Sequence, residues 1–91
     1  MEALLIRLIS DNQIIEQNPE IFPTEVCDGF YVKNAENSIL EIYSLSGKKC
    51  LQQTVNTSNQ KVNVGATIPA GVYLVKIHLP HTTRILKIVK L

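Results

Sequence analysis

The sequence predicts an all-β fold in which two antiparallel sheets pack face to face. The longest alternating stretch, residues 72–79, has the period-two pattern of a half-buried strand. Its inward face is predicted to carry Tyr73, Val75, Ile77 and Leu79. Shorter alternating runs follow from residue 21 onward, and turn residues separate them about every eight to twelve positions, which is typical of a sandwich or barrel. Because short turns join consecutive runs and no long helix is indicated, the simplest closure is a β-sandwich of about seven strands.

Turn chemistry places the boundaries of the other strands. In chain order they are predicted at 21–23, 30–33, 39–44, 48–54, 62–64 and 84–90. Pro23 confines the first strand to a sheet edge because it has no N–H to donate. Ser46 and Gly47 close a hairpin, since glycine accepts the positive φ of a tight turn. Pro69 and Gly71 suit the second and last places of a turn that precedes residues 72–79.

Composition and charge describe one small, balanced domain. Ninety-one residues with 45% hydrophobic content can form a single core, which is thin at this size. The net charge of +1 is too balanced to predict nucleic-acid binding by long-range attraction. The last sixteen residues nevertheless hold four basic side chains and no acid. These are Lys76, Arg84, Lys87 and Lys90, and the simplest interpretation is a solvated strand face.

Neither cysteine indicates a metal or redox site. Cys27 falls in a predicted loop and Cys50 in a predicted strand, and their spacing matches no zinc or redox motif. No metal or other cofactor is therefore predicted. Two interpretations stay open: a disulfide, if the chain acts outside the cytoplasm, or two free and partly buried thiols.

Residues 1–20 differ from the rest and are predicted to be a linker or an extra N-terminal segment. Their apolar run at 3–9 is broken by Arg7 and is far shorter than the roughly 20 residues that span a bilayer. Glu2 before the run and the polar residues 10–12 after it do not fit a secretory signal. The chain is then either cytoplasmic or the tail of a longer exported protein, and both a helix and a strand fit this segment.

Four motifs occur in order between residue 21 and the last residue. They are Ile-Phe-Pro leading to Asp-Gly-Phe-Tyr-Val at 21–32, Leu-Glu-Ile-Tyr-Ser-Leu-Ser-Gly-Lys-Lys at 40–49, Ile-Pro-Ala-Gly-Val-Tyr-Leu-Val-Lys at 68–76 and Lys-Ile-Val-Lys at 87–90. In order and spacing they resemble the C-terminal sorting domain of proteins exported by the type IX secretion system of Bacteroidetes. The third is similar to that family's Leu-Pro-x-Gly-x-Tyr-x-Val-Lys motif. Thr24 and Glu25 stand where the family commonly has Asn-Pro.

The resemblance implies an immunoglobulin-like antiparallel β-sandwich over residues 21–91 with no catalytic role. In the family, an outer-membrane export machine recognises this domain once the carrier protein has reached the periplasm. A cell-surface sortase then usually removes it and transfers the carrier to an anionic lipopolysaccharide, so the carrier ends at the cell surface or is secreted. The resemblance implies that the residues presenting the signal are Gly47, Pro69, Gly71, Lys76, Lys87, Ile88, Val89 and Lys90. Turn geometry also accounts for the first three of these residues, and core packing also accounts for Ile88.

Two other classes of function explain less of the sequence. An enzyme would draw on His78, His81, Asp28, Ser44 or Ser46, but their spacing does not join a nucleophile, a base and an orienting group. An adhesion or ligand-binding module of a surface protein is the better alternative, although two Phe, three Tyr and no Trp offer little surface for stacking on sugars. The open edges of the outer strands also predict a homodimer formed by strand pairing or swapping.

Overall fold

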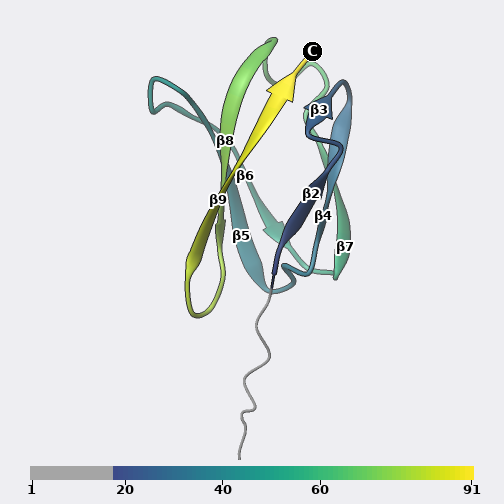
Figure 1. Ribbon diagram of the computed structural model, residues 1–91, viewed down its shortest axis with the longest axis vertical. Helices are drawn as coiled ribbons and strands as arrows, with labels where there is room; N and C mark the ends of the chain where they lie inside the picture. The colour runs from purple at the N-terminus through teal and green to yellow at the C-terminus, as the bar shows by residue number, and fades with distance from the viewer. Residues whose placement is uncertain (1–17) are drawn as a thin grey trace, which may run out of the picture.

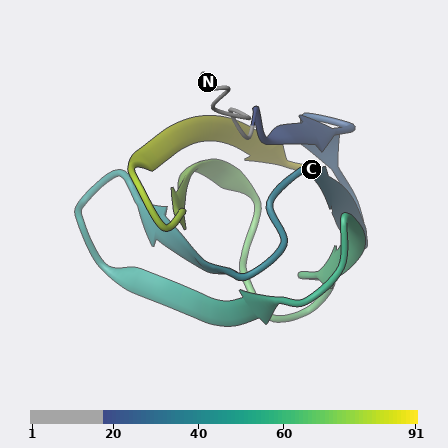
Figure 2. The same ribbon diagram turned by 90° about the horizontal axis from the view of Figure 1, so that it is seen from below.

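The computed structural model describes residues 18–91, which fold into two β-sheets stacked face to face (Figure 1, Figure 2). The choice between helix, strand and linker for the N-terminal segment lies outside this range for residues 1–17. The strands are β2 (Glu20–Phe22), β3 (Glu25–Val26), β4 (Gly29–Lys33), β5 (Ser38–Ser44), β6 (Lys49–Val55), β7 (Asn59–Asn63), β8 (Gly71–His78) and β9 (Thr83–Lys90). Residues 18–91 form no helix, so this part of the chain holds none that is long and apolar enough to span a membrane.

The strand order confirms the predicted all-β, immunoglobulin-like sandwich and adds one feature. One sheet has three strands in the order β2-β4-β7, and the other has five in the order β3-β9-β8-β5-β6. All neighbouring pairs are antiparallel except β3 and β9, which run parallel. β3 is an additional strand of two residues, too short to show alternation in the sequence. It forms because the N–H groups of Val89 and Leu91 donate to the carbonyls of Thr24 and Val26, both at 2.8 Å.

The core lies between the two sheets and follows the predicted alternation. In β8, Tyr73, Val75 and Ile77 are buried, and the half-buried Leu79 packs against the core just beyond the strand. The other buried members of the core are Val26, Phe30, Val32, Ala35, Leu40, Ile42, Val55, Val62, Val64, Ile68 and Ile88. Removing these apolar side chains from water drives the two sheets together. The outer faces of the strands therefore take no part in the core and can carry a site.

The two cysteines do not pair. Cys27 is exposed in the loop after β3, and Cys50 is half-buried in β6. Both thiols are free. Of the two interpretations left open by the sequence, the structure shows the free thiols, but Cys27 is exposed and not partly buried as predicted.

Candidate functional site

The turn before β8 is held together by its own side chains. The hydroxyl of Tyr73 donates a hydrogen bond to the carbonyl of Pro69 at 2.7 Å, and Tyr73 is only 5% exposed. Gly71 lies between them with a φ of +151°, and a Cβ at this position would meet Tyr73 Cε2 at 3.8 Å, an ordinary contact. Glycine is therefore required here by its backbone conformation, which L side chains rarely adopt. Pro69, Gly71 and Tyr73 form one local unit, which gives their spacing a structural reason.

The hairpin between β5 and β6 lies at the same end of the five-stranded sheet. Ser44, the last residue of β5, pairs with Tyr73 near the start of β8. Within the hairpin, the N–H of Gly47 donates to the carbonyl of Ser44, and the N–H of Ser44 donates to the carbonyl of Lys48, both at 2.9 Å. Gly47 has a φ of +94°, and nothing lies within 4 Å of a Cβ at this position. Space is available at Gly47, so the turn requires glycine for its φ alone.

Gly47→Ala is expected to lower the free energy of unfolding by about 1 kcal/mol, because an L side chain at a positive φ is strained. Urea unfolding followed by far-UV circular dichroism measures the change. Gly65→Ala is a matched control, since Gly65 has no positive φ and its Cβ would meet only the Asp28 carbonyl at 3.9 Å. This control should keep the native stability or raise it by up to about 1 kcal/mol. Equal losses in both variants would contradict the assignment of strain to Gly47.

The C-terminal strand β9 is paired on both sides near its end. Lys90 lies opposite Gly71 of β8, and β3 covers the other side of the strand at Val89. Ile88 is fully buried in the core, whereas Lys87 is exposed on the outer face. The last strand is therefore an integral part of the sandwich, and its lysines are displayed from a fixed backbone.

The structure separates the eight residues predicted to present the signal into two groups. One group lies at the end of the five-stranded sheet that also holds the C-terminus (Figure 1). It consists of Gly47, Pro69, Gly71, Val89 and Lys90. Ile88 lies next to this group, opposite Tyr73, and Lys76 and Lys87 lie further along β8 and β9. Their role in recognition stays a prediction, but their positions show that only the lysines among these three point to the surface.

A polar network crosses the outer face of the five-stranded sheet. Glu41 Oε1 accepts hydrogen bonds from His78 Nε2 at 2.7 Å and from the Tyr43 hydroxyl at 3.0 Å. The other oxygen, Glu41 Oε2, lies 3.3 Å from Lys49 Nζ. The pKa of Glu41 is lowered to about 2, mainly by the hydrogen bond from His78. Partial burial raises this pKa, whereas the contacts with Tyr43 and Lys49 lower it further. Partial burial, and next the hydrogen bond to Glu41, raise the pKa of Tyr43. The network thus ties β5 to both of its neighbours.

Native stability is expected to fall with the protonation of Glu41. The folded-state pKa of Glu41 is about 2, below its ordinary value of 4.5. The ionised carboxylate therefore stabilises the native state, and its full contribution is present at a pH above 4.5. This contribution is lost as the pH falls from 4.5 toward 2. Glu41→Gln cannot titrate and should lose less stability over the same interval. Urea midpoints measured at a series of pH values compare the two. Parallel profiles for the native chain and Glu41→Gln would show that the network does not favour the ionised form.

Thr83 extends this network to a hydroxyl. Its Oγ1 lies 3.2 Å from His78 Nδ1, so a hydroxyl, an imidazole and the carboxylate of Glu41 stand in line. The order is that of a nucleophile, a base and an orienting group. The His78 side chain is 39% exposed, so the line is open to solvent. The line connects β9, β8 and β5 across the outer face of the sheet. Within residues 18–91, no cluster of three or more His, Cys, Asp or Glu is placed to hold a metal ion.

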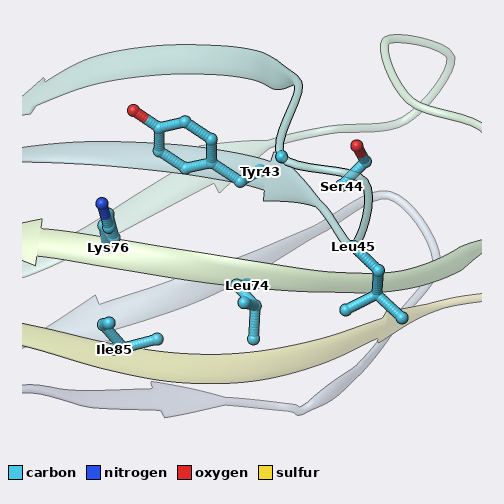
Figure 3. Close-up of a pocket in the computed structure, with 7 residues that line it drawn as sticks. Tyr43, Ser44, Leu45, Leu74, Lys76 and Ile85 are labelled. Carbon is cyan, nitrogen blue, oxygen red and sulfur yellow. The ribbon is translucent and has the colours of Figure 1, made fainter.

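A shallow groove of about 270 Å³ lies on the same outer face (Figure 3). Leu74 of β8 lies in its middle, with Tyr43 on the β5 side, Ile85 on the β9 side and Leu45 toward the hairpin (Figure 3). Lys76 Nζ lies over the Tyr43 ring, 5.1 Å from its centroid. Strand register brings these residues together, because Tyr43 pairs with Leu74 and Lys76 pairs with Ile85. The groove combines an apolar floor with one ammonium group.

Comparison with known proteins places this sandwich in a family. The sequence model described as the secretion system C-terminal sorting domain matches residues 20–91, which include every described strand. The chain belongs to this family. The match confirms the resemblance inferred from the four motifs, and it implies export of a carrier protein by the secretion machinery to the cell surface or medium.

The fold of the sorting domain also occurs in a solved structure. This is PorZ, described as an essential bacterial surface component of the type IX secretion system of Porphyromonas gingivalis. The two chains are 19% identical, with a TM-score of 0.67 over 80% of the sorting domain's chain and 11% of PorZ. The likeness shows a shared sandwich fold in a small part of PorZ. No curated protein sequence matches the chain.

The apolar side chains of the groove were not predicted to form a site, although their outward positions in the strand pattern indicated one. Leu74 is out of phase with the inward residues of β8, and Ile85 is out of phase with the buried Ile88 of β9. Large aliphatic residues at outward positions are not explained by the core. Leu45 sits in a hairpin turn, where a polar residue is usual, and it is 68% exposed.

Proposed function

We propose that the chain is a non-catalytic secretion signal that directs a carrier protein through the type IX outer-membrane machine. The observation that supports this most is the extent of the family match, which covers the whole described sandwich up to the last residue. Because these residues share one core, a machine that recognises them meets a folded surface. In this proposal the carrier crosses the periplasm first, and a surface sortase removes the domain after export.

A reporter fusion tests the sorting role. The full chain, attached behind a periplasmic reporter in a bacterium that has a type IX system, is expected to bring the reporter to the cell surface or the medium. The same reporter without the chain should stay in the periplasm. A reporter that stays in the periplasm with the chain attached would show that the chain is not a sufficient signal.

Lys87 offers a sharper test than truncation. Deleting residues 87–91 would also remove Ile88 from the core, so a loss of export after deletion has two explanations. Lys87→Glu changes only an exposed charge and is expected to reduce export of the reporter if the last strand presents the signal. Lys61→Glu, an exposed charge change on β7 of the other sheet, is the matched control. Equal export by the two variants would show that Lys87 is not part of the recognised signal.

One surface feature favours a ligand-binding role as the second candidate. Phe22 and Tyr31, 44% and 39% exposed, stack across β2 and β4 with their ring centroids 5.8 Å apart. Lys33 Nζ lies 4.9 Å from the centroid of the Phe22 ring, in cation–π geometry. Binding of the chain to a glycan array, lost in Tyr31→Ala, would support adhesion. An array without binding would leave the sorting role as the better explanation.

Self-association through a sheet edge is expected at high concentration. β6 is the last strand of the five-stranded sheet, so among residues 18–91 one side of its backbone has no strand partner. A second copy that pairs along this edge, or that exchanges a strand, would satisfy these groups. Sedimentation equilibrium over a concentration series should show a rising dimer fraction. A monodisperse monomer throughout the series would contradict this expectation.

A further inference from the structure

The groove on the outer face holds apolar side chains that the core does not use. Leu45 and Ile85 are 68% and 56% exposed, and they flank the half-buried Leu74 (Figure 3). The groove has a volume of about 270 Å³. Sites for small molecules typically measure about 300–1,000 Å³ and enclose most of their ligand. A small open groove of this kind is better suited to one large aliphatic side chain of a partner than to a cofactor.

One lysine of the lining, Lys76, and one lysine beside it, Lys87, lie on the same face of the sheet as the groove. Register places Lys87 opposite Leu74 and Lys76 opposite Ile85 on the same face of the sheet. Within the part of the chain that the structure describes, neither ammonium group forms an ion pair. Glu41 lies opposite Lys76 in the strand register, but its carboxylate contacts Lys49, His78 and Tyr43 instead. The charge at the groove is therefore positive and complementary to carboxylates.

The shape of the groove favours a protein partner over a lipid surface. Leu74 is half-buried at the centre, while the side chains of Leu45 and Ile85 stand more exposed around it. A recessed apolar floor accepts a side chain that projects from a partner. A bilayer surface would contact mainly the most protruding residues, and its binding would depend on apolar area and on anionic lipid.

We propose that this groove is a docking site for a segment of a partner protein that presents a large aliphatic side chain next to carboxylates. The aliphatic side chain packs on Leu74 and Ile85, and a neighbouring carboxylate pairs with Lys76. The biological role of this docking rests on the proposed sorting function, because Gly47 and Lys76, two residues predicted to present the signal, line the groove.

Titration of the isotopically labelled full chain with a blocked tripeptide, acetyl-Glu-Leu-Glu-amide, tests the docking by NMR. Amide shifts are expected at residues 43–47, 74–76 and 85. Acetyl-Lys-Leu-Lys-amide and acetyl-Glu-Ala-Glu-amide should bind about tenfold more weakly, because each loses one of the two complementary features. Shifts spread over the other sheet, or no shifts at all, would overturn the proposal. Vesicles of phosphatidylglycerol that bind at these residues when the tripeptide does not would also overturn it and indicate a membrane surface.

Matched variants locate the contact. Ile85→Lys and Lys76→Glu are expected to weaken tripeptide binding by about tenfold, since one removes an aliphatic wall and the other reverses a charge. Ile39→Lys changes a residue that is 43% exposed on the same sheet but outside the groove, and it should bind normally. Dispersed NMR spectra show that each variant is folded. Equal weakening by Ile39→Lys and Ile85→Lys would overturn the proposal.

The reporter fusion separates this docking from the sorting function. Loss of export in Ile85→Lys, with normal export in Ile39→Lys, would support a groove that serves sorting. Normal export by Ile85→Lys, in a variant that no longer binds the tripeptide, would show that the machine does not use the groove and would leave the sorting function intact. Failure of the native chain to export the reporter would instead count against the sorting function, and the titration alone would then decide the docking.

Discussion

Ile88→Ala is expected to lower the free energy of unfolding by about 2–5 kcal/mol, the range for removing a large aliphatic side chain from a packed core. Ile88 is fully buried on the inner face of β9, opposite Tyr73 of β8. Since domains are stable by only about 5–15 kcal/mol, this loss is a large share of the total stability. Urea unfolding followed by tyrosine fluorescence measures the change, because the chain contains three Tyr and no Trp.

Two further variants decide whether Ile88 acts through folding or through contact with the export machine. Ile39→Ala, on β5 of the same sheet, 43% exposed and outside the groove, should change stability by less than about 0.5 kcal/mol. Ile88→Val should cost about 0.5–1.5 kcal/mol and keep the surface unchanged. If export of the reporter falls in proportion to stability across this series, Ile88 serves the fold. A variant Ile88→Ala that is as stable as the native chain and yet is not exported would make Ile88 a contact residue.

Local patterns in the sequence were sufficient for the strands and turns that depend on neighbouring residues. The alternation in 72–79 predicted the buried face of β8, because the side-chain period of a strand is a local property. Gly47 predicted its hairpin because glycine accepts a positive φ more readily than other residues, which is a property of the residue itself. The Pro69 turn followed from the same kind of rule.

Features that depend on pairing between distant residues were not predictable in this way. β3 exists only because its backbone lies beside β9, more than sixty residues later in the chain. The contact between Glu41 and His78 requires the register of β5 against β8, which alternation alone does not determine. The same register creates the groove around Leu74. Period-two patterns state which face a residue occupies, whereas the identity of its neighbours on that face comes from strand order.

Tyr73→Ala is expected to lower the free energy of unfolding by about 3–5 kcal/mol, the range for removing a buried aromatic ring. The ring contributes in two ways. It fills the core, where Tyr73 is 5% exposed, and its hydroxyl bonds the carbonyl of Pro69 at 2.7 Å. Urea unfolding followed by far-UV circular dichroism suits this variant, because it removes one of the fluorescent side chains.

Tyr73→Phe separates these two contributions. It keeps the ring in the core and removes only the hydrogen bond to Pro69, so the expected loss is about 0.5–1.5 kcal/mol. The value should fall near the lower end, because Pro69 is exposed and water can replace the lost donor. Tyr31→Phe, on an exposed ring, is the matched control and should change stability by less than about 0.5 kcal/mol. A Tyr73→Phe variant that keeps native stability but no longer exports the reporter would contradict this expectation. It would show that the hydroxyl does not stabilise the turn and that the tyrosine of the Pro-x-Gly-x-Tyr motif belongs to the recognised surface.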